Sequence, residues 1–163
     1  MTILVVHGSK RGGTQGLAEM VGAALTELGH DVRVAPAGKE RELAGVEAVV
    51  VAGGLYANRW HGDARRFVRR NARDLASMPV WLIASGPLDT TADAGTTPDV
   101  PQVASAAASV GARGTTTFGG YLAADATGFP ASAMAKNGKA GDWRNPERVK
   151  AWAAEVHKAL TAS

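Results

Sequence analysis

Short apolar runs alternate with amphipathic segments along the whole chain. The runs 3–6, 46–52 and 79–85 are almost continuously apolar, which is typical of strands buried on both faces of a parallel sheet. A weaker strand is predicted at 31–35 and a fifth strand at 114–118. Between the strands, apolar residues recur at helical spacing. This pattern predicts helices at 14–28, 62–75, 100–110 and from Asn145 onward.

Strands that alternate with helices predict an α/β fold with a parallel sheet and right-handed crossovers. We expect one domain over residues 1–163, with a doubly wound, five-stranded sheet and helices on both of its faces. In such sheets, ligands bind beyond the carboxyl ends of the strands. Binding residues are therefore expected in the loops after the first, third and fourth strands, at 7–13, 53–61 and 85–95.

The composition excludes several kinds of site. The chain has no cysteine, so disulfides, iron–sulfur clusters, thiolate metal sites and cysteine nucleophiles are excluded. No histidines and acids have metal-ligand spacing, and no catalytic residue stands out. No apolar run approaches the ~20 residues of a membrane-spanning helix, and the first residues are typical of a strand rather than a signal peptide. We expect a cytoplasmic protein without a metal site.

The loop after the first strand has the composition of an anion-binding turn. It reads His7-Gly8-Ser9-Lys10-Arg11-Gly12-Gly13-Thr14 and leads into a helix. The first turn of a helix has free N–H groups and a partial positive charge, which favour a bound phosphate. The residues predicted to hold this phosphate are Ser9, Lys10, Arg11, Gly12, Gly13 and Thr14.

Other phosphate-binding loops do not fit these residues. Thr14 stands where a Walker A loop has its lysine, so a nucleoside triphosphatase is not expected. The dinucleotide pattern Gly-x-Gly-x-x-Gly is absent. A phospho-receiver domain would have paired acids where this chain has His7-Gly8. The remaining pattern, Ser-x-x-Gly-x-Thr, resembles the loop with which flavodoxins hold the monophosphate of FMN.

The other two loops could surround a flavin ring, which needs flat apolar surface on its faces and amides near its polar edge. In the second loop the candidates are Leu55, Tyr56, Ala57, Asn58, Arg59, Trp60 and His61. Alternatively, Tyr56 and Trp60 pack down on the strand ends without touching a ligand. In the third loop the candidates are Ser85, Gly86, Pro87 and Leu88. Many short flavodoxins have a tyrosine in this third loop, and this chain does not.

Taken together, the loops resemble the flavodoxin-domain proteins that include the menaquinone-dependent protoporphyrinogen oxidase type. The motifs that carry the resemblance are Val6-His7-Gly8-Ser9 with Gly12 and Thr14, Gly53-Gly54-Leu55-Tyr56 leading to Trp60-His61, Ser85-Gly86-Pro87-Leu88, and Gly141-Asp142-Trp143. The resemblance implies a flavodoxin-like sheet of strand order 2-1-3-4-5, an FMN cofactor and two-electron chemistry. It also implies a small organic substrate such as a porphyrinogen or a quinone. The segment 121–142 corresponds in position to an extra segment of that family.

The distribution of charge bears on the redox chemistry. Six arginines and a single acid lie between Arg59 and Arg73, and basic residues flank both candidate loops. Nearby cations stabilise an anion, so they favour the reduced, anionic flavin and raise its potential. We therefore expect a flavin-dependent oxidoreductase that transfers two electrons. A one-electron flavodoxin that serves a protein partner is the alternative.

The same charges leave a second cofactor open. An 8-hydroxy-5-deazaflavin coenzyme has an anionic polyglutamate tail, which Lys10, Arg11, Arg65 and Arg69 could attract. The arginine-rich helix lacks the interleaved aromatic residues of a nucleic-acid platform, so no nucleic acid is expected. The mildly apolar segment 121–134 could touch a quinone or a membrane surface. The sequence does not indicate an oligomeric state.

Overall fold

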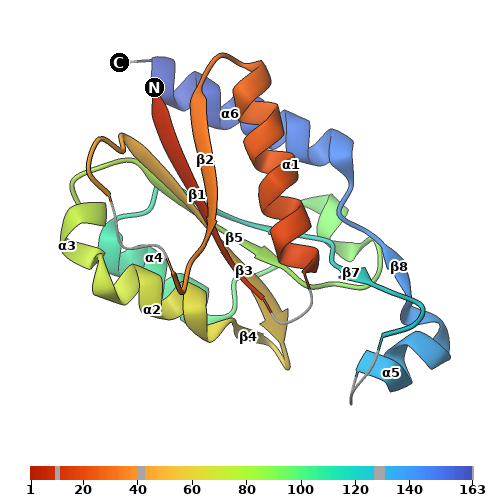
Figure 1. Ribbon diagram of the computed structural model, residues 1–163. Helices are drawn as coiled ribbons and strands as arrows, with labels where there is room; N and C mark the ends of the chain where they lie inside the picture. Colours follow the sequence, from red (N-terminus) through yellow and green to blue (C-terminus); the bar gives the residue numbers. More distant parts are fainter. Residues whose placement is uncertain (10–11, 40–42, 127–130, 163) are drawn as a thin grey trace.

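Five parallel strands form the centre of the protein in the computed structural model, which describes residues 1–9, 12–39, 43–126 and 131–162 (Figure 1). Their order is β2-β1-β3-β5-β6. They are β1 (Thr2–Gly8), β2 (Asp31–Pro36), β3 (Ala48–Tyr56), β5 (Val80–Ser85) and β6 (Gly114–Phe118). Numbered among themselves, these five strands have the predicted order 2-1-3-4-5, so the predicted fold is confirmed.

Helices cover both faces of the sheet because both faces of its strands are apolar. The helices on one face are α1 (Gly13–Glu27) and α6 (Pro146–Thr161); those on the other are α2 (Gly62–Arg70), α3 (Ala72–Leu75) and α4 (Pro101–Val110). Successive side chains of a strand point to opposite faces. Accordingly, Ile3 and Val5 of β1 belong to the core beside α1 and α6, whereas Leu4 and Val6 belong to the core beside α2.

Two predicted boundaries were wrong. The third strand does not end at Ala52 but continues to Tyr56, and the chain then turns back as β4 (Arg59–Trp60), which pairs antiparallel with β3. The segment 62–75 is not one helix but two, α2 and α3, which meet at Asn71. The Asn71 side chain donates a hydrogen bond to the carbonyl oxygen of Phe67 at 3.0 Å. Asn71 itself has φ at −109° and ψ at 15°, outside the helical conformation, and this separates the two helices.

The segment 119–142, for which the sequence pattern predicts no helix or strand, contains short elements. β7 (Tyr121–Leu122) and β8 (Gly141–Asp142) form a two-stranded antiparallel ladder. Between them lie α5 (Ala131–Met134) and a turn, η2 (Ala135–Lys139), in which Asn137 and Gly138 leave the helical conformation. Figure 1 shows this segment extending from the body beside the end of the sheet at which β1 and β3 finish. Among the described residues, no helix is long and apolar enough to span a membrane.

Candidate functional site

A cavity of about 330 Å³ lies where β3 and β5 end and α1 begins. Its volume is near the lower end of the roughly 300–1,000 Å³ of small-molecule sites. It is lined by Gly13, Thr14, Leu55, Tyr56, Ala57, Ser85, Gly86, Leu88, Gly120, Tyr121, Leu122, Ala131 and Met134. Its position is the one expected for a ligand site in a doubly wound sheet.

All three predicted loops contribute to this cavity. Of the residues singled out in the sequence, those that line it are Gly13, Thr14, Leu55, Tyr56, Ala57, Ser85, Gly86 and Leu88. The fold brings these residues together although they are separated by up to about 75 positions, because parallel strands end at the same edge of the sheet. Their contact with a cofactor stays a prediction.

The beginning of α1 offers backbone amides to the cavity. Gly12 precedes the helix with φ at 78°, a left-handed conformation that glycine adopts without strain. It has no side chain to cap the helix, and the first turn contains no acid. Thr14 is buried and lines the cavity, whereas Ser9 is half-buried and lies just after β1. This helix end can therefore accept an anion. Lys10 and Arg11 lie outside the described residues.

A tight hairpin at the end of β3 forms the second wall. Ala57 and Asn58 occupy its two turn positions with φ at 50° and 59°, as a hairpin turn with two left-handed residues requires. Gly54 allows the ring of Tyr56 to lie close to Thr14. A Cβ atom on Gly54 would be 2.9 Å from Tyr56 Cε2 and 3.0 Å from Thr14 Oγ1. Asn58 and Arg59 are exposed at the hairpin tip and do not line the cavity.

Trp60 and His61 do not line the cavity, and their contact with a cofactor stays a prediction. The Trp60 side chain is 1% exposed, and its Nε1 donates a hydrogen bond to the carbonyl oxygen of Ile83 at 3.2 Å. The reversal of the chain in the hairpin directs Trp60 into the core on the α2 face. Nδ1 of His61 accepts a hydrogen bond from the backbone N–H of Asp63 at 3.1 Å, so His61 caps α2.

The third loop packs closely against the second. A Cβ atom on Gly86 would lie 2.8 Å from Leu55 Cβ, so glycine is needed for this contact. Pro87 does not line the cavity. Its carbonyl oxygen accepts a hydrogen bond from the N–H of Gly120 at 2.8 Å and ties this loop to the segment that leads into β7. Leu88 is the apolar side chain that this loop contributes.

Five lining residues were not among the predicted site residues: Gly120, Tyr121, Leu122, Ala131 and Met134. They come from β7, the residue before it, and α5. The sequence offered one signal for these residues, the mild apolarity of the segment 121–134. This signal indicated contact with a quinone or a membrane surface, but it did not single out individual residues. Tyr121 and Met134 are among the few large hydrophobic side chains that remain exposed.

None of the residues that the structure places in the wall of the cavity is charged, but charged groups lie nearby. Arg144 lies beside it and donates two hydrogen bonds to Asp142, from Nε at 2.9 Å and from Nη2 at 2.7 Å. These bonds lower the pKa of Asp142 and raise the pKa of Arg144. Burial lowers the pKa of His7 near the end of β1, and Glu19 partly offsets this effect.

A family model described as a flavodoxin domain matches residues 4–136, which is more than half of the chain. No match was found among curated protein sequences.

Solved structures with the same fold include flavodoxins from two bacteria. A variant of the flavodoxin from Pseudomonas aeruginosa is 19% identical, with a TM-score of 0.62 over 98% of this chain and 99% of that one. The oxidised flavodoxin 1 of Bacillus cereus is 12% identical, with a TM-score of 0.61 over 99% and 100% of the two chains. Rubredoxin oxygen:oxidoreductase from Desulfovibrio gigas is 14% identical, with a TM-score of 0.67 over 99% of this chain and 36% of that one. At these identities the likeness concerns the fold alone.

Proposed function

Because the chain belongs to the flavodoxin domain family, we propose that it is an FMN-binding oxidoreductase that exchanges two electrons with a small organic substrate. A porphyrinogen or a quinone is the kind of substrate that the family resemblance suggests. The observation that carries the proposal is the cavity at the carboxyl ends of the strands, which joins a helix N-terminus to apolar and aromatic walls.

The residues of this cavity fit the parts of FMN. The uncapped first turn of α1 and the hydroxyl of Thr14 suit a phosphate. Leu55, Tyr56 and Leu88 provide apolar and aromatic surface for a flat ring. When bound, FMN supplies a ring that accepts and releases two electrons. The chain's own contribution is to hold this ring, orient it and exclude water from part of its surface.

The uncharged wall supports two-electron chemistry. A carboxylate near a reduced, anionic flavin would disfavour it by like-charge repulsion, but no such group is among the described lining residues. A potentiometric titration of the purified flavoprotein tests this reasoning. We expect one two-electron step. Two well-separated one-electron steps would instead favour the alternative of an electron carrier that serves a protein partner.

Identifying the bound cofactor tests the proposal as a whole. The cofactor released from the purified protein is expected to show absorption bands at ~370 and ~450 nm, as a flavin does. It should comigrate with FMN on chromatography. A protein that yields no flavin, and takes up none when FMN is added, would contradict the proposal.

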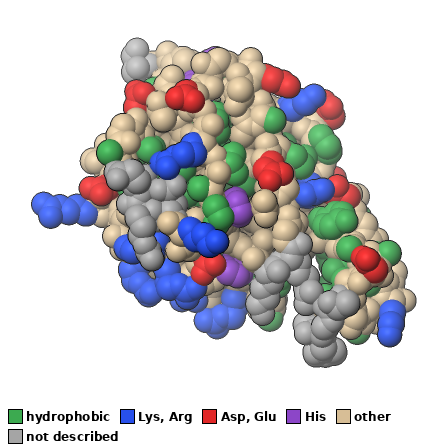
Figure 2. All heavy atoms as spheres, viewed as in Figure 1, with side chains coloured by type: hydrophobic (Ala, Val, Ile, Leu, Met, Phe, Trp, Pro, Cys, Tyr) green, Lys and Arg blue, Asp and Glu red, His purple; other side chains and the backbone are tan. Residues whose placement is uncertain are grey.

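A deazaflavin coenzyme is the second candidate, and the exposed arginines of α2 favour it. Figure 2 shows basic side chains gathered over this helix. They are Arg65, Arg66, Arg69 and Arg70. An anionic polyglutamate tail could lie along such a surface. If the absorption spectrum of the released cofactor showed a single band at ~420 nm and no flavin bands, it would identify this coenzyme instead of FMN.

A further inference from the structure

The aromatic residues at the cavity come from two different segments. The chain has two tyrosines, and both line the cavity, Tyr56 from the end of β3 and Tyr121 from β7. No other aromatic residue that the structure describes lines it. Trp60 lies in the core, and the loop after β5 contributes only Leu88 as a bulky side chain. Tyr121 therefore offers the aromatic surface that the third loop lacks.

Tyr121 lies directly against the end of α1 that suits a phosphate. A Cβ atom on Gly13 would lie 3.3 Å from Tyr121 Cβ and 3.4 Å from its carbonyl oxygen. On the other side, a Cβ atom on Gly120 would lie 2.9 Å from the carbonyl oxygen of Gly86. The two glycines thus let β7 approach both the first and the third loop closely.

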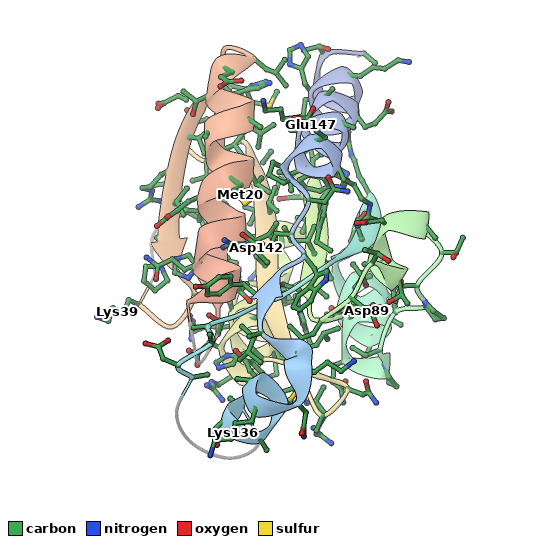
Figure 3. All side chains as sticks on the ribbon, turned by 90° about the vertical axis from the view of Figure 1, so that its right-hand side faces the viewer. Met20, Lys39, Asp89, Lys136, Asp142 and Glu147 are labelled. Carbon is green, nitrogen blue, oxygen red and sulfur yellow. The ribbon has the colours of Figure 1, made fainter. Side chains whose placement is uncertain are left out.

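Arg144 holds the ring of Tyr121 from one side. Its Cζ lies 4.9 Å from the centroid of that ring, in a cation–π arrangement. Asp142 accepts two hydrogen bonds from this guanidinium, and Nη1 donates a longer one, of 3.4 Å, to the carbonyl oxygen of Gly13. Figure 3 shows Asp142 beside the N-terminal half of α1. The ring is therefore fixed relative to the start of α1.

The arrangement leaves the rest of the Tyr121 ring available to a ligand. The guanidinium covers one face, yet the residue is 42% exposed and lines the cavity. A large aromatic side chain so exposed, and held by Arg144, is suited to pack on a flat conjugated ring. The Asp142 carboxylate neutralises the guanidinium, so the assembly orients the ring without placing a net charge beside it.

We propose that Tyr121 packs against the flavin ring as a cofactor-binding residue, and that Arg144 and Asp142 are positioning residues that hold it. The inference rests on the proposed FMN site. It differs from the pattern of many short flavodoxins, since the aromatic residue comes from β7, after β6, and not from the loop after β5.

Titration of the cofactor-free protein with FMN, followed by flavin fluorescence, tests the role of Tyr121. Tyr121→Phe retains the ring, so its Kd should stay within about 3-fold of the unmodified protein with equal quenching. Tyr121→Leu should raise the Kd about 10-fold or more and leave the bound flavin more fluorescent. Because Tyr121 is 42% exposed and belongs to neither hydrophobic core, both variants should unfold as the unmodified protein does.

A Tyr121→Leu variant with unchanged Kd and quenching would overturn the inference and leave the proposed function standing. If the unmodified protein bound no FMN, the proposed function itself would fail. The two failures are therefore distinguishable.

A double-mutant cycle tests the positioning residues. Arg144→Met keeps much of the side chain but removes the charge and the hydrogen bonds, so it should raise the Kd about 3-fold and reduce quenching. In the Tyr121→Leu background the same substitution should have no further effect on quenching or Kd, because Arg144 acts through the tyrosine. Asp142→Asn should resemble Arg144→Met. Additive effects of Arg144→Met and Tyr121→Leu would overturn the positioning role.

Discussion

Gly53 shows how one missing side chain shapes the wall beside the cavity. It lies in β3 directly under the indole of Trp60, and a Cβ atom there would clash with that ring. The contact is tight because Trp60 returns from the hairpin into the core and donates its N–H to Ile83. Sequence reasoning could identify a glycine-rich turn here. It could not determine the direction of Trp60, which depends on the positive φ of Ala57 and Asn58.

Replacing Gly53 with alanine should destabilise the fold. The indole is packed in the core and cannot move away freely, so we expect the free energy of unfolding to fall by ~1–3 kcal/mol, as for other overpacked cores. Denaturant unfolding measures this change. In a Trp60→Leu background the same substitution should cost less, because the clashing ring is gone. An equal cost in both backgrounds would show that the indole is not the obstacle.

Individual elements depend on local signals that the sequence shows to different degrees. The strands β1, β3 and β5 could be predicted from short, almost continuous apolar runs, and the helices α1, α4 and α6 from apolar residues at helical spacing. β7 and β8 could not, since strands of two residues show no period. Tyr121 was missed as a site residue for this reason. Its position depends on pairing with Asp142 across the ladder.

The beginning of α6 provides a direct test of a local signal. Asn145 has φ at 54°, and its side chain accepts a hydrogen bond from the N–H of Arg148 at 3.2 Å. Asn145→Ala removes the cap and keeps the unfavourable φ, so it should lower the free energy of unfolding by ~1–2 kcal/mol. Asn145→Gly also removes the cap, but glycine adopts the positive φ without strain. It should therefore lower the free energy of unfolding by only about a few tenths of a kcal/mol. Thermal or denaturant unfolding of the two variants measures this order, and the reverse order would contradict it.

A pair of histidines connects α6 to the residue before β2. His30 Nε2 and His157 Nδ1 lie 2.8 Å apart, within hydrogen-bond distance. Burial, then His157, then the N-terminal amine lower the pKa of His30 below its ordinary value of 6.5. The unfolded chain therefore binds a proton at higher pH than the folded chain does. The lowered pKa of His30 therefore contributes to the free energy of unfolding. This contribution is complete well above pH 6.5, the pKa in the unfolded chain, and is lost as the pH falls through the lowered pKa of the folded chain.

We accordingly expect the free energy of unfolding to decrease between about pH 7.5 and about pH 5. His30→Gln should reduce this decrease, because glutamine does not titrate. It should not abolish it, since burial lowers the pKa of His7 in the same direction. Denaturant titrations at the two pH values, with and without the substitution, measure the difference. An identical pH dependence in both proteins would contradict the role of the pair.

At the scale of the whole molecule, topology brings the site together. Parallel strands finish at one edge of the sheet, so Thr14, Tyr56 and Ser85 meet at a single cavity although they lie far apart in sequence. This much could be predicted from the alternation of strands and helices alone. The wall formed by Tyr121 and Met134 could not be predicted, because it depends on a segment that crosses the end of α1 without a periodic pattern.

We infer that the start of α1 holds the phosphate of FMN. Fluorescence titration of the cofactor-free protein with FMN and with riboflavin, which lacks only the phosphate, tests this claim most directly. We predict that FMN binds at least about 100-fold more tightly, because charge-assisted hydrogen bonds to the helix end are lost with riboflavin. Equal affinities for the two flavins would contradict the account.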